Sequence, residues 1–161
     1  MIIEPAIYTF STIEKAARDW KDAGMTIVFT NGCFDLIHAG HVRYLKEAQN
    51  LGDLLVVGVN SDQSIKNLKG PDRPIVPLRE RLEVLLSLRW VDAAVPFDEP
   101  TPVELIKVIR PHVLVKGGDW DPERIAGREI LETYGGKTVN VPFHKGVSTT
   151  EIIQKIRSSD R

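Results

Sequence analysis

Short apolar runs alternate along this chain with longer stretches in which apolar residues recur every three or four positions. The short runs are rich in β-branched residues, which is typical of strands buried in a parallel sheet. They lie at residues 26–30, 54–60, 93–96, 113–116 and 137–141. The longer stretches have the spacing of amphipathic helices. They lie at residues 11–23, 41–50, 78–88 and 102–110, within 122–134, and from 148 onward.

Two capping boxes predict where the first and last helices begin. Ser11 and Glu14 have the spacing of such a box, so we expect the first helix to cover 11–23 and to stop at Gly24. Ser148 and Glu151 repeat the pattern before the last helix. The apolar positions of that helix predict a buried stripe of Ile152, Ile153 and Ile156.

Repeated strand–helix units of this size predict an α/β fold, a Rossmann-like, doubly wound parallel sheet with right-handed crossovers. The 161 residues suit one domain, and no repeat, low-complexity segment or linker divides them. We expect a single domain, 1–161, with an N-terminal helix over 11–23 and the main core over about 25–158. Ligands bind such sheets beyond the carboxyl ends of the strands, where the topology reverses. Three unusual clusters fall there, at residues 30–41, 116–120 and 143–150.

The charges nearly cancel over the whole chain but not within it. Lys and Arg number 21 against 22 Asp and Glu, a formal net charge of -1, which argues against a general nucleic-acid binder. Residues 66–89 hold six basic and three acidic side chains, a local excess of +3. This excess fits either a solvated helix face or a patch for a small polyanion such as a nucleoside triphosphate, and charge alone leaves both open.

Apolar run lengths and cysteine usage bear on the compartment. The longest strand-like apolar run covers six residues, 54–59, against the roughly 18 that a membrane span needs. The first residues lack the basic region and apolar core of a signal peptide. One cysteine, Cys33, excludes an internal disulfide framework and fits a reducing compartment. We therefore expect a cytoplasmic protein without a membrane partner.

Two common nucleotide-binding motifs are absent. Gly136-Lys137-Thr138 resembles the end of a P-loop, but Leu131 stands where that motif needs a glycine, and a predicted strand follows rather than precedes it. No two glycines are separated by a single residue, so the Gly-x-Gly-x-x-Gly dinucleotide fingerprint is missing too. A P-loop kinase or a Rossmann dehydrogenase therefore has no support.

A pair of histidines, His38 and His41, brackets Gly40 between a predicted strand and a predicted helix. The pair is open to three interpretations: structural histidines, metal ligands together with Asp35, or phosphate donors. Phosphate binding explains most, because a helix start adds free amides and partial positive charge, and a glycine lets backbone approach a phosphate closely.

Four motifs in order resemble the cytidylyltransferase-like nucleotidyltransferase superfamily. They are residues 30–41 around the histidine pair, Arg81 within 78–81, Lys116-Gly117-Gly118-Asp119-Trp120, and 147–152. Within the superfamily the match is closest to the D-glycero-D-manno-heptose 1-phosphate adenylyltransferase family, in which this module often follows a sugar kinase in one bifunctional chain. The resemblance implies a nucleotidyltransferase fold of the His-x-Gly-His type and covers roughly residues 25–158.

The resemblance also implies a reaction and roles for residues. AMP passes from ATP to heptose 1-phosphate, giving ADP-heptose and pyrophosphate, by in-line attack on the α-phosphorus. The implied catalytic residues are His38 and His41 on the triphosphate, Lys69 from a mobile loop, and Arg81 on the leaving phosphates. The implied ATP-binding set adds Thr30, Asn31, Gly32, Phe34, Gly40, Lys116, Gly117, Asp119, Ser148, Thr149 and Thr150. Asp35, Lys66 and Trp120 are implied toward the sugar phosphate.

The same resemblance implies the partners. Mg²⁺ is expected to be carried with ATP, with no metal site of the protein's own. The expected partners are ATP, a sugar 1-phosphate from a separate sugar kinase, and further copies of the chain in a homodimer or higher assembly, with no nucleic acid.

One departure keeps a second enzyme in view. Relatives that use CTP with glycerol 3-phosphate commonly carry an arginine in the last motif where Phe143 stands here. This difference favours the adenylyltransferase over a cytidylyltransferase for glycerol 3-phosphate or another small phosphate. A non-catalytic nucleotide sensor on the same fold is the alternative outside the enzymes.

Overall fold

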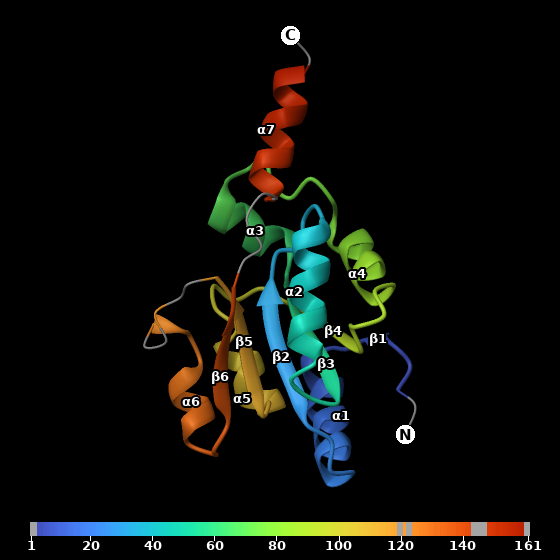
Figure 1. Ribbon diagram of the computed structural model, residues 1–161, viewed down its shortest axis with the longest axis vertical. Coiled ribbons are helices and arrows are strands. Elements are labelled where there is room, and N and C mark those ends of the chain that lie inside the picture. The colour runs from blue at the N-terminus through green and yellow to red at the C-terminus, as the bar shows by residue number, and fades with distance from the viewer. Residues whose placement is uncertain (1–2, 119–120, 122–123, 143–147, 160–161) are drawn as a thin grey trace.

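The computed structural model describes residues 3–118, 121, 124–142 and 148–159. Its centre is a six-stranded sheet in which every pairing is parallel, with the order β1-β4-β3-β2-β5-β6 (Figure 1). The strands are β1 (Ala6–Ile7), β2 (Ile27–Gly32), β3 (Leu54–Asn60), β4 (Ala93–Phe97), β5 (Val113–Gly117) and β6 (Lys137–Val141). The predicted doubly wound parallel sheet is therefore confirmed.

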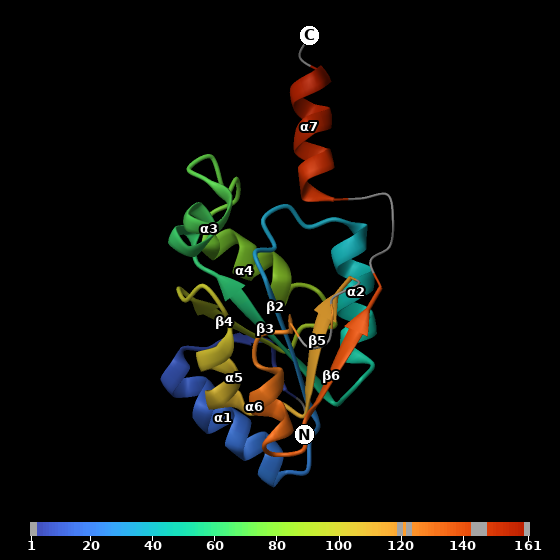
Figure 2. The same cartoon turned by 90° about the vertical axis from the view of Figure 1, so that its left-hand side faces the viewer.

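Helices cover both faces of the sheet (Figure 2). They are α1 (Phe10–Asp22), α2 (Ala39–Gln49), α3 (Asp62–Lys69), α4 (Leu78–Leu86), α5 (Val103–Ile109), α6 (Arg128–Glu132) and α7 (Thr149–Ser159). One apolar cluster joins α1, α5 and α6 to one face, and a second joins α2 and α4 to the other. Phe29 and Leu114 point into the first cluster, while Val28 and Val115 point into the second, as the alternation of strand side chains requires.

The chain reverses direction across the sheet between β2 and β5. From β2 it proceeds through α2 to β3 on one side, and later returns through α5 to β5 on the other side of β2. The register pairs Val28 with Val113 and Phe29 with Leu114, so continuing it places Asn31 opposite Lys116. The carboxyl ends of β2 and β5, which we call the switch point, are where this topology binds ligands.

The N-cap of the first helix lies two residues earlier than the sequence predicts. Thr9, not Ser11, is the N-cap, and its side chain accepts a hydrogen bond from the amide of Thr12. The capping box is formed by Thr9 and Thr12, so the predicted box of Ser11 and Glu14 is wrong. The other end is as predicted: the helix ends just before Gly24, which adopts the left-handed conformation with φ of 78°.

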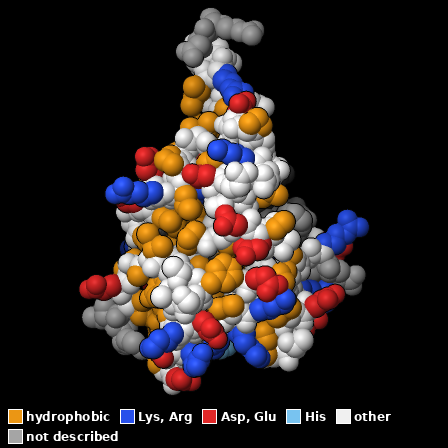
Figure 3. All heavy atoms as spheres, turned by 180° about the vertical axis from the view of Figure 1, so that it is seen from behind, with side chains coloured by type: hydrophobic (Ala, Val, Ile, Leu, Met, Phe, Trp, Pro, Cys, Tyr) orange, Lys and Arg blue, Asp and Glu red, His pale blue; other side chains and the backbone are white. Residues whose placement is uncertain are grey.

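The last helix departs most from prediction. Figures 1 and 2 show α7 projecting away from the sheet, and none of its residues is buried. Ile156 is 59% exposed, so the predicted buried stripe of Ile152, Ile153 and Ile156 is wrong. Hydrophobic side chains are visible on this projection in the surface view (Figure 3). The apolar period of α7 is real, but no packing partner within the described residues covers it.

Candidate active site

His38 begins the helix that carries the histidine pair. It is the N-cap of α2, and its Nδ1 accepts a hydrogen bond of 3.1 Å from the amide of Gly40. An imidazole that accepts at Nδ1 carries its proton at Nε2 when neutral. His38 therefore presents an N–H donor on its outer nitrogen, beside the free amides of the helix start.

His41 lies in the first turn of α2 and stacks on His38. The ring centroids are 3.9 Å apart with 28° between the planes. Burial, the neighbouring His38 and the charge of Lys69 lower the pKa of His41 to about 4. Its Nδ1 is buried without a hydrogen-bond partner in the described part of the chain. At neutral pH the imidazole of His41 is therefore neutral.

Thr30 and Phe34 pack around the histidine pair and the helix that carries it. Thr30 is fully buried, and its hydroxyl lies 2.6 Å from the Tyr44 hydroxyl, which donates to the carbonyl of Val115. Phe34 is 5% exposed, and its ring centroid is 5.3 Å from that of His41. Both side chains are buried, and the contact with ATP predicted for these two residues stays a prediction. Thr30 contacts α2 through Tyr44, and Phe34 packs against His41, so the two residues hold α2 and His41 in place.

Asp35 ties the histidine loop to the segment between α3 and α4. Its side chain is 1% exposed and accepts hydrogen bonds from the Arg73 guanidinium at 2.6 Å and from the amides of Ile75 and Val76. Burial raises the pKa of Asp35, but these hydrogen bonds lower it more, so the net shift is downward. These bonds give the Asp35 carboxylate a loop-ordering role, and its predicted contact with the sugar phosphate stays a prediction.

Arg81 is the central cross-link of the site. Its side chain is fully buried and donates to the carbonyls of Cys33, Asn60 and Val76. It also forms a 2.8 Å ion pair with Asp62. Four donors directed at protein acceptors leave little of this guanidinium for a ligand. These bonds make Arg81 a cross-link between the loops around the site, and its predicted contact with the leaving phosphates stays a prediction.

The two candidate lysines lie on a helix, not on the predicted mobile loop. Lys66 and Lys69 occupy the last turn of α3, whose N-cap is Ser61. The charge of Lys69 lowers the pKa values of both His41 and Cys33, which places its ammonium on the histidine side of the site. Both lysines are exposed. The electrostatic effect of Lys69 on His41 makes it the better placed of the two for a phosphate.

Lys116 and Asn31 meet across the switch point. Asn31 is the next-to-last residue of β2. Its Oδ1 accepts a hydrogen bond from the ammonium of Lys116, a residue of β5. Burial lowers the pKa of Lys116 to about 8. Gly32 and Gly117, also predicted near ATP, are the last residues of the same two strands. The structure thus brings this part of the predicted set together.

The start of α7 reaches the histidine loop from the far end of the chain. The Thr149 hydroxyl donates to the carbonyl of Leu36 at 3.1 Å, and the Ser148 hydroxyl accepts from the amide of Glu151 at 3.1 Å. Thr150 is exposed in the first turn of the helix. Asp119, Trp120 and Phe143 lie outside the described residues, so what was predicted for them stays a prediction.

Sequence reasoning missed three residues that hold the site together. They are Asn60, Asp62 and Arg73. Asn60 and Asp62 had a signal, because polar residues directly after a buried strand lie at the ligand-binding edge. Arg73 had none, since its partner Asp35 is 38 positions away in the sequence.

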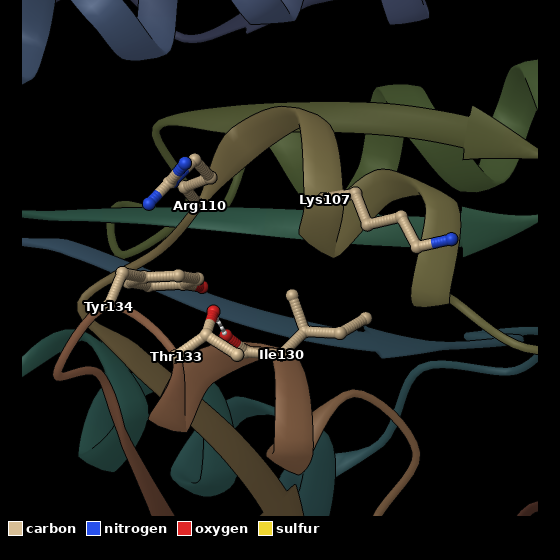
Figure 4. A pocket seen from close by; sticks show the side chains of 5 residues that line it. All are labelled: Lys107, Arg110, Ile130, Thr133 and Tyr134. Carbon is tan, nitrogen blue, oxygen red and sulfur yellow. Dashed lines mark hydrogen bonds between the residues drawn. The ribbon is translucent and has the colours of Figure 1, made fainter.

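A recess lined in part by basic side chains lies away from the switch point, between α5 and α6. It has a volume of about 150 Å³ and is lined by Lys107, Arg110, Ile130, Thr133 and Tyr134 (Figure 4). Arg110 lies over the Tyr134 ring at 4.7 Å, and Lys107 pairs with Glu104. Both cations flank the C-terminal end of α5, where free carbonyls favour positive charge. Elsewhere, acidic and basic side chains are interspersed, as on the face in Figure 3.

No group of three or more His, Cys, Asp or Glu side chains in the described part of the chain is arranged to hold a metal ion. Among its helices, none has the length and apolar character to cross a membrane.

A doubly wound sheet with paired histidines at a helix start beside its switch point defines the class of α/β nucleotide-binding proteins. The chain belongs to the cytidylyltransferase-like family, whose model matches residues 29–159. The resemblance drawn from the motifs is therefore confirmed at the level of the family.

Similarity to known proteins covers most of the chain. The chain is 55% identical over 138 residues to the bifunctional protein HldE of Geotalea uraniireducens, covering 86% of this chain and 28% of the relative. It is 49% identical over 155 residues to the HldE protein of a Nitratiruptor species, covering 96% and 33%. The chain thus spans about a third or less of these relatives.

A solved structure has a similar fold. The lipopolysaccharide core biosynthesis protein of Thermoplasma volcanium matches with a TM-score of 0.64 and 30% identity. The match covers 77% of this chain and all of that protein.

Proposed function

We propose that the chain transfers AMP from ATP to D-glycero-D-manno-heptose 1-phosphate, giving ADP-heptose and pyrophosphate. The product would supply lipopolysaccharide or another surface glycan. The observation that carries the proposal is the stacked pair His38 and His41 at the start of α2. The motif resemblance, the HldE relatives and the lipopolysaccharide core biosynthesis protein support this acceptor.

The histidine pair suits phosphoryl chemistry because it adds donors where negative charge develops. Backbone amides at the start of α2 face the same place and carry partial positive charge. A sugar phosphate is already anionic at neutral pH, so the reaction needs orientation and charge stabilisation more than a general base. His38, through its Nε2–H, and His41 would donate to oxygens of the triphosphate, including those on the pentacoordinate α-phosphorus.

The neighbouring elements would complete the nucleotide site. Lys69 would neutralise the leaving phosphates, and Ser148 with the first amides of α7 would contact them from the other side. Thr149 would act through its bond to the Leu36 carbonyl, which fixes the histidine loop. Gly40 would let the α2 backbone approach the phosphates closely.

The remaining partners follow from this chemistry. Mg²⁺ would arrive with ATP as the MgATP substrate, since the nearby Asp35 and Asp62 carboxylates already pair with arginines. A sugar kinase would act upstream, and the reaction would run in the cytoplasm. The exposed apolar side of α7 suits a homodimer or higher assembly.

A specificity panel tests this function. The protein is incubated with MgATP or MgCTP and with heptose 1-phosphate, glucose 1-phosphate or glycerol 3-phosphate, and pyrophosphate release is followed. We expect release with ATP and heptose 1-phosphate and at least about tenfold lower kcat/KM with the other pairs. Turnover with CTP and glycerol 3-phosphate alone would establish the cytidylyltransferase instead. ATP binding without release from any pair would indicate the nucleotide sensor.

A further inference from the structure

Lys116 and Asn31 face the opposite side of the sheet from the histidines. Val115 packs with α2, so Lys116, the next residue of β5, points to the face of α5. Asn31 points the same way: a Cβ added at Gly58 would lie 3.3 Å both from the Asn31 Cβ and from Leu105 of α5. His38 and His41 instead belong to α2, on the other face. The switch point is therefore lined by polar groups from both faces.

The Lys116 ammonium lacks an acidic partner within the described residues. Within the described residues its hydrogen-bond partner is the neutral amide of Asn31, and no carboxylate pairs with it. An ammonium has three donors, and the bond to Asn31 is the one that the described residues use. Its burial disfavours the charged form, as the lowered pKa of about 8 records. An anionic ligand would supply the negative charge that stabilises the protonated form of Lys116.

We propose that Lys116 binds the phosphate group of the acceptor sugar and holds it for attack on the α-phosphorus. This inference rests on the proposed function and deepens it, because it separates Lys116 from the ATP-binding residues. In an in-line displacement the attacking and leaving oxygens stand on opposite sides of phosphorus. With the leaving phosphates at α2, the attacking phosphate approaches from the face to which Lys116 points.

The step balances without a further reactant. A phosphate oxygen of the acceptor forms the new bond to the α-phosphorus, and the bond from the α-phosphorus to its bridging oxygen breaks. The electron pair of that bond leaves with pyrophosphate. The attacking oxygen is already anionic, so Lys116 positions it and partly balances its charge, and Asn31 orients the ammonium.

Steady-state kinetics of Lys116→Met and Lys116→Arg test the assignment. Methionine keeps the length of the side chain without its charge, and arginine keeps the charge. We expect the KM for heptose 1-phosphate to rise about 10–100-fold in Lys116→Met and less in Lys116→Arg, as for loss of a charge-assisted hydrogen bond. The Kd of the non-reactive analogue α,β-methylene ATP, measured by calorimetry, should change less than about threefold. Lys46→Met, at the far end of α2, is the matched control with unchanged constants.

Each outcome has one meaning. A raised acceptor KM with an intact analogue Kd supports the proposal. An unchanged acceptor KM, or an analogue Kd that weakens as much as the acceptor KM, overturns it and leaves Lys116 with ATP or without a ligand role. Thermal unfolding of both variants shows whether the fold persists, and the arginine variant carries the test if the methionine variant unfolds. Failure of the wild-type protein to turn over any acceptor would instead remove the proposed function itself.

Discussion

Replacing His41 by alanine is expected to lower kcat about 10²–10³-fold, and the same holds for His38→Ala. Each change removes a preorganised donor from the place where charge develops on the phosphates. The stacked rings, 3.9 Å apart, are held by Phe34 and by the Gly40 amide before any ligand binds, so their orientation costs nothing during the reaction. Initial rates of pyrophosphate release at saturating substrates measure the effect.

The control separates catalysis from stability. His112 lies at the opposite end of the sheet, where its Nδ1 accepts from the amide of Ile27 at 2.9 Å. His112→Asn keeps an acceptor near that amide and should leave kcat unchanged. Thermal unfolding should remain cooperative in all three variants. An unchanged kcat in both His38→Ala and His41→Ala would contradict the assignment of the pair to phosphate.

Replacing Arg81 by methionine is expected to destabilise the fold by about 3 kcal/mol or more, because three backbone carbonyls around its buried guanidinium lose a charged donor. Asp62 and the carbonyls of Cys33, Asn60 and Val76 all lose a donor. Urea unfolding of the free protein measures the change in the free energy of unfolding. Arg79→Met, an exposed neighbour on α4, should shift it by no more than about 0.5 kcal/mol.

The alternative role of Arg81 makes a different prediction. If its guanidinium held the leaving phosphates, Arg81→Met would lower kcat while the free energy of unfolding stayed near that of the wild type. That result would contradict the cross-linking role. Loss of stability accompanied by loss of activity agrees with a positioning residue.

Strands were the most predictable part of the fold. Residues 54–60 form β3 over the full predicted range, because every residue of that strand is buried and the sequence run is correspondingly apolar. The start of α1 was less predictable, since Thr9, Ser11 and Thr12 can all cap a helix and only the chain path selects among them. The period of α7 reveals an apolar side, but not what covers it.

The candidate site, like the fold, was predictable from the sequence only in part. The histidine pair could be predicted because its chemistry lies within four consecutive residues at a helix start. The roles of Arg81 and Asp35 could not, because their partners lie up to 48 and 41 positions away in the sequence. Nothing local distinguishes an arginine that binds phosphate from one that binds three backbone carbonyls. The Lys116–Asn31 bridge likewise depends on the pairing of β2 with β5.

Transfer of an isotope from the acceptor tests the central claim most directly. Heptose 1-phosphate labelled with ¹⁸O in its three non-bridging phosphate oxygens is incubated with MgATP, and the products are analysed by ³¹P NMR and mass spectrometry. In-line attack by the acceptor on the α-phosphorus predicts all three labels in ADP-heptose, one of them in the bridge between its two phosphorus atoms, and unlabelled pyrophosphate. Label in pyrophosphate, or a bridge without ¹⁸O, would contradict that attack, and the absence of ADP-heptose would contradict the proposed function.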